Sequence, residues 1–166
     1  MAESSIVSSV ENVARLLSKE WFVKGVLHHT AFKLANGETY LSVNRPAIDS
    51  YTEDVESFVH SHSSFQFQGE TSYYKRAVLN VGNIRGIDIE VGESKMKVDV
   101  EVEPRDSHTK SHAGIFSRIQ NKNLKNGQFM KVGPTSEEIS TDTILLEVRN
   151  ELLSISSVEE CPIPPM

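Results

Sequence analysis

The chain has 166 residues, a formal net charge of −6 and a single cysteine, Cys161. This length fits one domain, and a composition of 38% hydrophobic and 24% charged residues is ordinary for a globular protein. One cysteine excludes an internal disulfide and a thiolate zinc cluster. No apolar run approaches the roughly 20 residues that cross a bilayer, and no signal-peptide pattern opens the chain. We therefore expect a cytoplasmic protein with no membrane partner.

The first third of the chain shows helical and strand patterns in turn. Apolar side chains recur at spacings of three and four over residues 4–20, which predicts an N-terminal amphipathic helix. The runs 26–34 and 38–45 are rich in β-branched and aromatic residues, and the ANG between them predicts a hairpin or a tight turn. Residues 47–59 predict a short helix whose apolar stripe is Ile48, Tyr51, Val55, Phe58 and Val59.

The centre of the chain has the most strand signals. The runs that predict strands are 76–82, 84–91, 95–103, 112–119 and 129–132. In the third of these runs valines and a methionine alternate with charged residues, which is typical of an antiparallel strand with one solvated face. The glycines of GNIRG at 82–86 predict a turn and a bulge.

The end of the chain returns to a helical pattern. Residues 136–155 predict a C-terminal helix, and residues 157–166 predict a flexible tail. The order of elements therefore predicts one α+β domain over residues 1–156. Its mainly antiparallel central sheet would carry N-terminal and C-terminal helices.

The segment 105–131, which begins RDSHTKSHAGIFSRIQNK, differs in charge from the rest of the chain. It has a net charge of +5, and the remainder has −11. This asymmetry favours a positive surface on an acidic body, which would bind a protein partner or an anionic ligand. The candidate ligand-binding residues are Arg105, Lys110, Arg118, Lys122 and Lys125.

Two alternatives remain open for the same segment. Phe116 and Phe129 would stack on single-stranded nucleic acid if they were exposed beside the basic residues. Conversely, both phenylalanines would belong to the core if the lysines only keep a loop in solution.

The six histidines fall into three close pairs: His28 and His29, His60 and His62, and His108 and His112. Imidazole is a common metal ligand and a common acid or base near neutral pH. A metal site would use His108 and His112, or His60 and His62, with a third ligand from Asp106 or from the other pair. A phosphoester hydrolase would use candidates among His28, His60, His62 and His112. The alternative is that all three pairs are partly exposed loop and strand-end residues.

Other catalytic and cofactor motifs are missing from the sequence. There is no HExxH, no P-loop, no GxGxxG after a strand and no GxSxG. The sequence therefore does not indicate which cofactor, if any, the protein binds.

Three short stretches, AFKLANGETYLSVNR, VGNIRGIDIEV and SHAGI, occur in this order along the chain. Their order resembles small bacterial cytoplasmic proteins that share an F…E-x-x-L-S-V strand and a late S-H-A-x-I segment. Some of these are found beside mobile-element or defence genes. The resemblance implies no established activity and carries over no catalytic residue. It points to Arg45, Arg85, His112 and the L-S-V strand as places for a shared pocket.

Taken together, these patterns favour a non-catalytic binding module for a protein partner or an anionic ligand. The alternatives are a small histidine-dependent phosphoester hydrolase and a nucleic-acid-binding protein.

Overall fold

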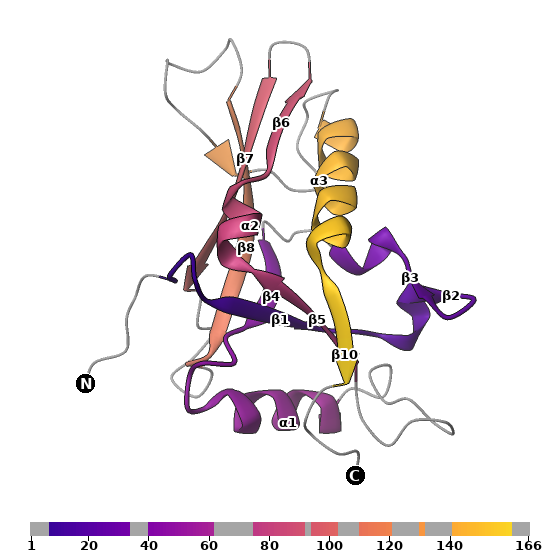
Figure 1. Ribbon diagram of the computed structural model, residues 1–166, viewed down its shortest axis with the longest axis vertical. Coiled ribbons are helices and arrows are strands. Elements are labelled where there is room, and N and C mark those ends of the chain that lie inside the picture. Colours follow the sequence, from indigo (N-terminus) through magenta and orange to yellow (C-terminus); the bar gives the residue numbers. More distant parts are fainter. Residues whose placement is uncertain are drawn as a thin grey trace.

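The computed structural model describes residues 7–33, 40–61, 75–91, 94–102, 110–120, 130–131 and 141–160. Within these ranges eight strands form one curled antiparallel sheet in the order β10-β5-β1-β4-β8-β7-β6, with β9 paired to β8 (Figure 1). The predicted α+β class with a mainly antiparallel sheet is confirmed. The strands are β1 Asn12–Leu16, β4 Tyr40–Asn44, β5 Lys75–Asn80, β6 Asp88–Val91, β7 Ser94–Val102, β8 His112–Gln120, β9 Met130–Lys131 and β10 Ser157–Glu160.

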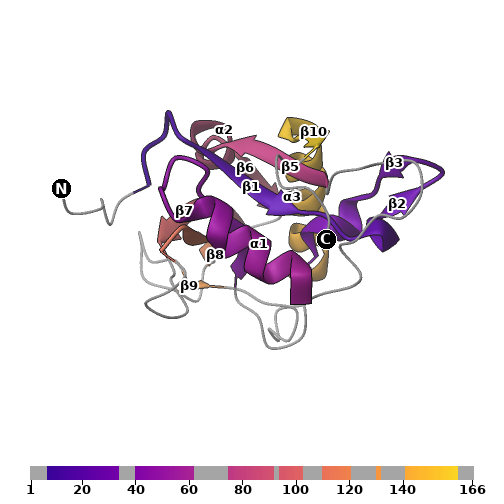
Figure 2. The same ribbon diagram turned by 90° about the horizontal axis from the view of Figure 1, so that it is seen from below.

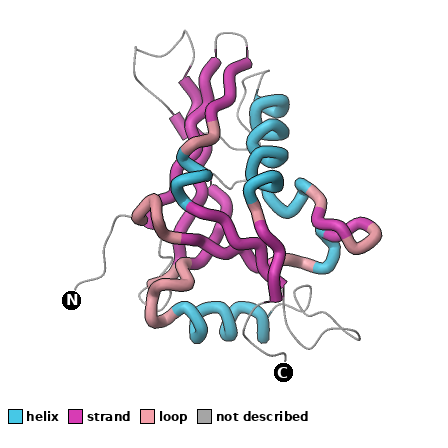
Figure 3. The backbone as a smooth tube through the Cα atoms, viewed as in Figure 1, coloured by secondary structure: helices cyan, strands magenta, loops and turns pink. Residues whose placement is uncertain are grey.

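Helices and a separate hairpin connect these strands (Figure 3). The α-helices are α1 Tyr51–Ser61, α2 Val81–Arg85 and α3 Thr141–Ile155. Two 3-10 helices, η1 Lys19–Trp21 and η2 His29–Phe32, flank a hairpin of β2 Phe22–Val23 and β3 Val26–Leu27.

The main core lies on one face of the sheet, under α3 and η2. Val148 and Leu152 of α3 and Phe32 of η2 are buried in it together with alternate residues of the strands. On β7 the residues Met96, Val98 and Val100 are buried, so the alternation predicted for this strand is confirmed. A second, smaller cluster lies on the opposite face, where Tyr51 and Val55 of α1 pack against Ala14. Figure 2 shows α1 running across this outer side.

The predicted helix over residues 4–20 is wrong. Residues Asn12–Leu16 form β1, which pairs with β5 along its whole length. Val13 and Ala14 are both buried although they point to opposite faces of the sheet. A strand covered on both faces loses the polar alternation that identifies strands, and its apolar spacing then imitates a helix.

The predicted hairpin between 26–34 and 38–45 is also wrong. β3 pairs with β2, which precedes it, and the chain then enters η2. The second run does form a strand, β4, but its neighbours are β1 and β8. Helix α1 overlaps the helix predicted over 47–59, but it begins only at Tyr51 and ends at Ser61.

GNIRG forms a helix and not the predicted turn and bulge. The side chain of Asn80 caps α2 by accepting a hydrogen bond from the amide of Asn83 at 3.1 Å. Asparagine is a strong N-cap residue, so a single cap is enough to begin this short helix between two strands. The strand predicted over 84–91 is consequently shortened to Asp88–Val91.

The end of the chain is only partly as predicted. Helix α3 lies inside the predicted range 136–155, but it is followed by β10, so the helix is not the last element. Ser157–Glu160 pair antiparallel with β5, and the predicted tail from residue 157 is therefore wrong for its first four residues. Exposed side chains on all four residues explain why the sequence resembles a tail.

The β2–β3 hairpin depends on a turn with left-handed backbone. Lys24 and Gly25 have φ values of 51° and 81°, as in the two-residue turns that match the twist of a hairpin. A Cβ at Gly25 would meet nothing within 4 Å, so an alanine there would be strained only by its backbone.

We expect Gly25→Ala to lower the free energy of unfolding by about 1–2 kcal/mol in urea denaturation, because L-residues disfavour this φ. Gly86→Ala is the matched control. Gly86 has a helical φ of −80°, and a Cβ there would make ordinary contacts at 3.5 Å. Equal effects of the two substitutions would contradict the left-handed turn.

Candidate functional site

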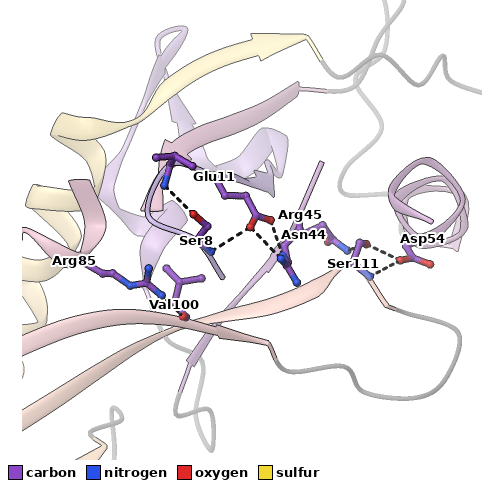
Figure 4. A network of polar contacts seen from close by, with 9 residues as sticks. Ser8, Glu11, Asn44, Arg45, Asp54, Arg85, Val100 and Ser111 are labelled. Atoms are coloured by element: carbon purple, nitrogen blue, oxygen red, sulfur yellow. Dashed lines mark hydrogen bonds and ion pairs between the residues drawn. The ribbon is translucent and has the colours of Figure 1, made fainter. Parts of the chain in front are cut away.

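A buried ion pair fastens the N-terminal segment to the sheet (Figure 4). Arg45, directly after β4, donates from Nε to Oε1 of Glu11 at 2.6 Å and from Nη2 to Oε2 at 3.0 Å. Only 5% and 11% of these two side chains are exposed. A bidentate pair so poorly solvated has its charge already neutralised, so Arg45 is not available to an anionic ligand.

Asp54 ties α1 to the start of β8. Its Oδ2 accepts hydrogen bonds from the amide of Ser111 at 3.1 Å, from the Ser111 hydroxyl at 2.5 Å and from the Ser50 hydroxyl at 3.0 Å. Asn44 donates to the Ser111 hydroxyl at 2.9 Å. Ser111 is fully buried, so no substrate could reach its hydroxyl, and the network has a structural role.

Arg85 is engaged in the same way. Its guanidinium donates to Oδ1 of Asp99 at 2.7 Å, to the hydroxyl of Ser9 at 2.9 Å and to the carbonyl of Val100 at 3.2 Å. Both arginines that the resemblance singled out therefore hold residues 8–11 against the sheet. No shared pocket is formed by these contacts.

The basic segment 105–131 is only partly within the described residues. Arg105, Lys122 and Lys125 lie outside them. Lys110 is exposed in a turn before β8. Arg118 forms an ion pair with Glu101 across the neighbouring strand and lies over the ring of Phe116. The charge of Arg118 is thus matched inside the protein, which weakens its candidacy as a ligand-binding residue.

Of the two aromatic residues in that segment, the structure describes only Phe116, and it is buried. Phe116 is 1% exposed and contacts the ring of Tyr40 at 5.1 Å between centroids. Phe129 lies outside the described residues. Stacking of nucleic-acid bases on Phe116 is excluded by its burial.

The structure does not bring the histidines His28 and His112 onto one face. His112 contacts Tyr40 and alternates on β8 with Ala113, which belongs to the main core. His28 directly precedes η2, whose Phe32 lies in that same core, so the sheet separates the two histidines. His62, His108 and the side chain of His60 lie outside the described residues. Among the residues described, no group of three or more His, Cys, Asp or Glu could hold a metal ion.

A surface that the sequence did not suggest lies at the β2–β3 hairpin. We refer to residues 18–33, which comprise η1, β2, β3 and η2, as the lobe. In Figures 1 and 2 its hairpin extends sideways, away from the main sheet. The side chain of Arg15 holds the lobe on the sheet by donating to the carbonyls of Ala31 in η2 at 2.6 Å and Ser42 in β4 at 2.7 Å.

The lobe has an apolar tip and carries three exposed lysines. Val23 and Val26, 54% and 68% exposed, form a cross-strand pair beside the turn. Lysines stand exposed at the tip and at both ends of the lobe, and in the part of the chain that the structure describes none of them is ion-paired. They are Lys19, Lys24 and Lys33.

A sequence signal for the lobe does exist. The stretch VKGV places two valines around a turn dipeptide, and the lobe has a net charge of +2 with its histidines neutral. The predicted helix over 4–20 and the predicted strand over 26–34 included the two ends of the lobe, so no hairpin was predicted around VKGV. The error in secondary structure therefore concealed the surface.

Comparison with known proteins does not assign the chain to a family. No protein-family model, curated protein or solved structure matches the chain. Within the described ranges no helix is long and apolar enough to cross a membrane.

We expect Arg45→Met to destabilise the protein by about 3–5 kcal/mol, because it leaves the Glu11 carboxylate buried without its partner. The double variant Glu11→Leu/Arg45→Met should be less destabilised than the single one. Urea unfolding measures both changes.

The control for this prediction is Lys95→Met. Lys95 and Glu90 form an ion pair at 3.4 Å in which about 60% of each side chain is exposed, and its loss should cost less than about 1 kcal/mol. A cost for Arg45→Met no larger than that of the control would show that the buried pair does not fasten the N-terminal segment.

Proposed function

We propose that the chain is a non-catalytic binding module for a protein partner and that the lobe is its contact surface. The observation that supports this most strongly is the exposed pair Val23 and Val26 beside cations without carboxylate partners. The partner is an acidic protein segment that also carries apolar side chains.

The exposed valines favour a protein contact. Directly opposed residues of a hairpin project from the same face, so Val23 and Val26 form one small apolar patch. Apolar side chains held out in water gain free energy when a partner covers them. The left-handed turn between them keeps the patch in one shape before binding, which lowers the entropy lost in the complex.

The distribution of ion pairs favours an acidic partner. Five ion pairs occur in the described residues, and they engage Arg45, Arg76, Arg85, Lys95 and Arg118 on the main sheet and its connections. The lysines of the lobe take no part in them. Their charge is therefore free to attract a carboxylate-rich segment and to fix its orientation.

A protein partner is favoured over a nucleic acid because the tip presents the aliphatic side chains of Val23 and Val26, which offer no aromatic face on which a base could stack.

Three sequence predictions stay proposals beside this one. They are that residues 105–131 also contact the partner, that the protein is bacterial and that it acts in the cytoplasm. The ion pair between Arg118 and Glu101 reduces the contribution that Arg118 can make to such a contact.

A defined peptide tests this function. The probe is a fluorescent peptide of alternating valine and glutamate, and its matched control replaces each valine by serine. Fluorescence anisotropy should show tighter binding of the valine peptide. Substituting both Val23 and Val26 by serine should weaken that binding by about tenfold, since two buried valines contribute more than 1.4 kcal/mol. Affinity should also fall as salt is raised.

The same assay contains the outcomes that would reject the proposal. Equal affinity for the valine and serine peptides would remove the role of the apolar patch. If a single-stranded oligonucleotide with the same number of charges bound more tightly than the valine peptide, the lobe would be a nucleic-acid-binding surface and not a protein-binding one.

A further inference from the structure

Three basic side chains lie on η2, its N-cap and α3, two elements that pack together. The rings of His28 and His29 lie with their centroids 4.0 Å apart. Arg149 lies on α3, about 120 positions further along the sequence, and its charge acts on His29. We refer to these three side chains as the cluster. All three side chains are half-buried, which leaves each of them partly open to solvent.

Two nitrogen atoms in this cluster are buried without a hydrogen-bond partner. They are Nδ1 of His29 and Nε of Arg149. Leaving a buried polar atom unpaired is unfavourable, so most such atoms in folded proteins have a partner. Here two occur in one cluster, on side chains from two different elements.

His28 contributes a donor with a defined tautomer. Its Nδ1 accepts a hydrogen bond from the amide of Thr30 at 3.3 Å, as the N-cap of η2. An accepting Nδ1 carries no proton, so the neutral ring has its proton on Nε2. His28 therefore adds an N–H donor to those of Arg149 and of His29.

The charges in the cluster have no counter-ion in the described residues. None of the ion pairs or hydrogen bonds found there joins a carboxylate to His28, His29 or Arg149. Burial lowers the pKa of His29 below its ordinary value, and the electrostatic influence of His28 and Arg149 acts in the same direction. An anion bound between these side chains would attract all three of them and so offset their mutual repulsion.

We propose that His28, His29 and Arg149 form a binding site for a small tetrahedral dianion, phosphate or sulfate. A dianion offers several oxygens to donors that approach from two elements, whereas a carboxylate has two oxygens and one charge. Arginine and histidine are effective partners for phosphate because their hydrogen bonds to it are charge-assisted. This site is inferred from its own contacts and does not depend on the proposed protein partner.

Nuclear magnetic resonance titration of the whole protein with sulfate tests the site, because sulfate keeps its charge near neutral pH. The Nε–H signal of Arg149 and the ring signals of His28 and His29 should shift and saturate together. Sulfate should raise the pKa of His29, since a bound negative charge favours the imidazolium. His28 and Arg149 are the charged groups that act on this imidazole.

Matched variants distinguish binding at this site from a non-specific effect of the protein's charge. Arg149→Gln should weaken sulfate binding at least tenfold, and Arg149→Lys should restore part of the affinity. Lys95→Gln removes the same charge from an exposed position on β7 and should leave the affinity unchanged. Circular dichroism confirms that each variant is folded.

Titrations with other anions define the chemical class of ligand that the site binds. Phosphate should bind like sulfate, and acetate should bind much more weakly. Phosphoserine shows whether the dianion can be carried on a larger molecule or must be free. An absent or non-saturating shift, an equal loss in Lys95→Gln, or acetate binding as tightly as sulfate would each overturn the proposal.

Discussion

The position of the lobe depends on one side chain, that of Arg15. Arg15 projects from β1, donates hydrogen bonds to the carbonyls of Ala31 and Ser42 at 2.6 and 2.7 Å, and lies 5.0 Å from the ring centroid of Trp21. One guanidinium thus joins η2, β4 and η1, which the chain order separates. Charge-assisted hydrogen bonds are stronger than neutral ones, and the flat guanidinium also packs on an aromatic ring. The contacts of Arg15 therefore fix the two 3-10 helices from which the β2–β3 hairpin extends.

Cations have different roles in the two parts of the structure. On the main sheet, arginines such as Arg45 and Arg85 are paired with carboxylates and hold residues 8–11 in place. The lobe lysines Lys19, Lys24 and Lys33 form no ion pair among the described residues, and His28, His29 and Arg149 form a cluster of basic side chains. Unmatched charge contributes little to folding stability, so its presence in one region favours a role in binding.

The sequence was informative wherever the side-chain pattern was produced by a single local cause. β7 was predictable because one of its faces is solvated, and Met96 and Val98 alternate there with charged residues. β1 was not predictable, since Val13 and Ala14 are buried on opposite faces by elements far away in sequence. The ion pair of Arg118 was not predictable for the same reason. Arg118 looks like a free cation in sequence, and only the strand register places Glu101 within its reach. The cluster around His29 requires a helix about 120 residues away, which no local pattern could indicate.

The central claim is that the lobe is a preformed surface held by Arg15, and amide hydrogen exchange in Arg15→Met tests it most directly. The amide of His28, which donates to the carbonyl of Trp21 at 2.8 Å, reports on the lobe, and the amide of Val98 reports on the main sheet. Loss of the charge-assisted bonds removes roughly 1.5–3 kcal/mol, which corresponds to at least about tenfold faster exchange. We predict this acceleration at His28 with little change at Val98. Equal acceleration at both amides, or none at His28, would contradict the claim that Arg15 holds the lobe.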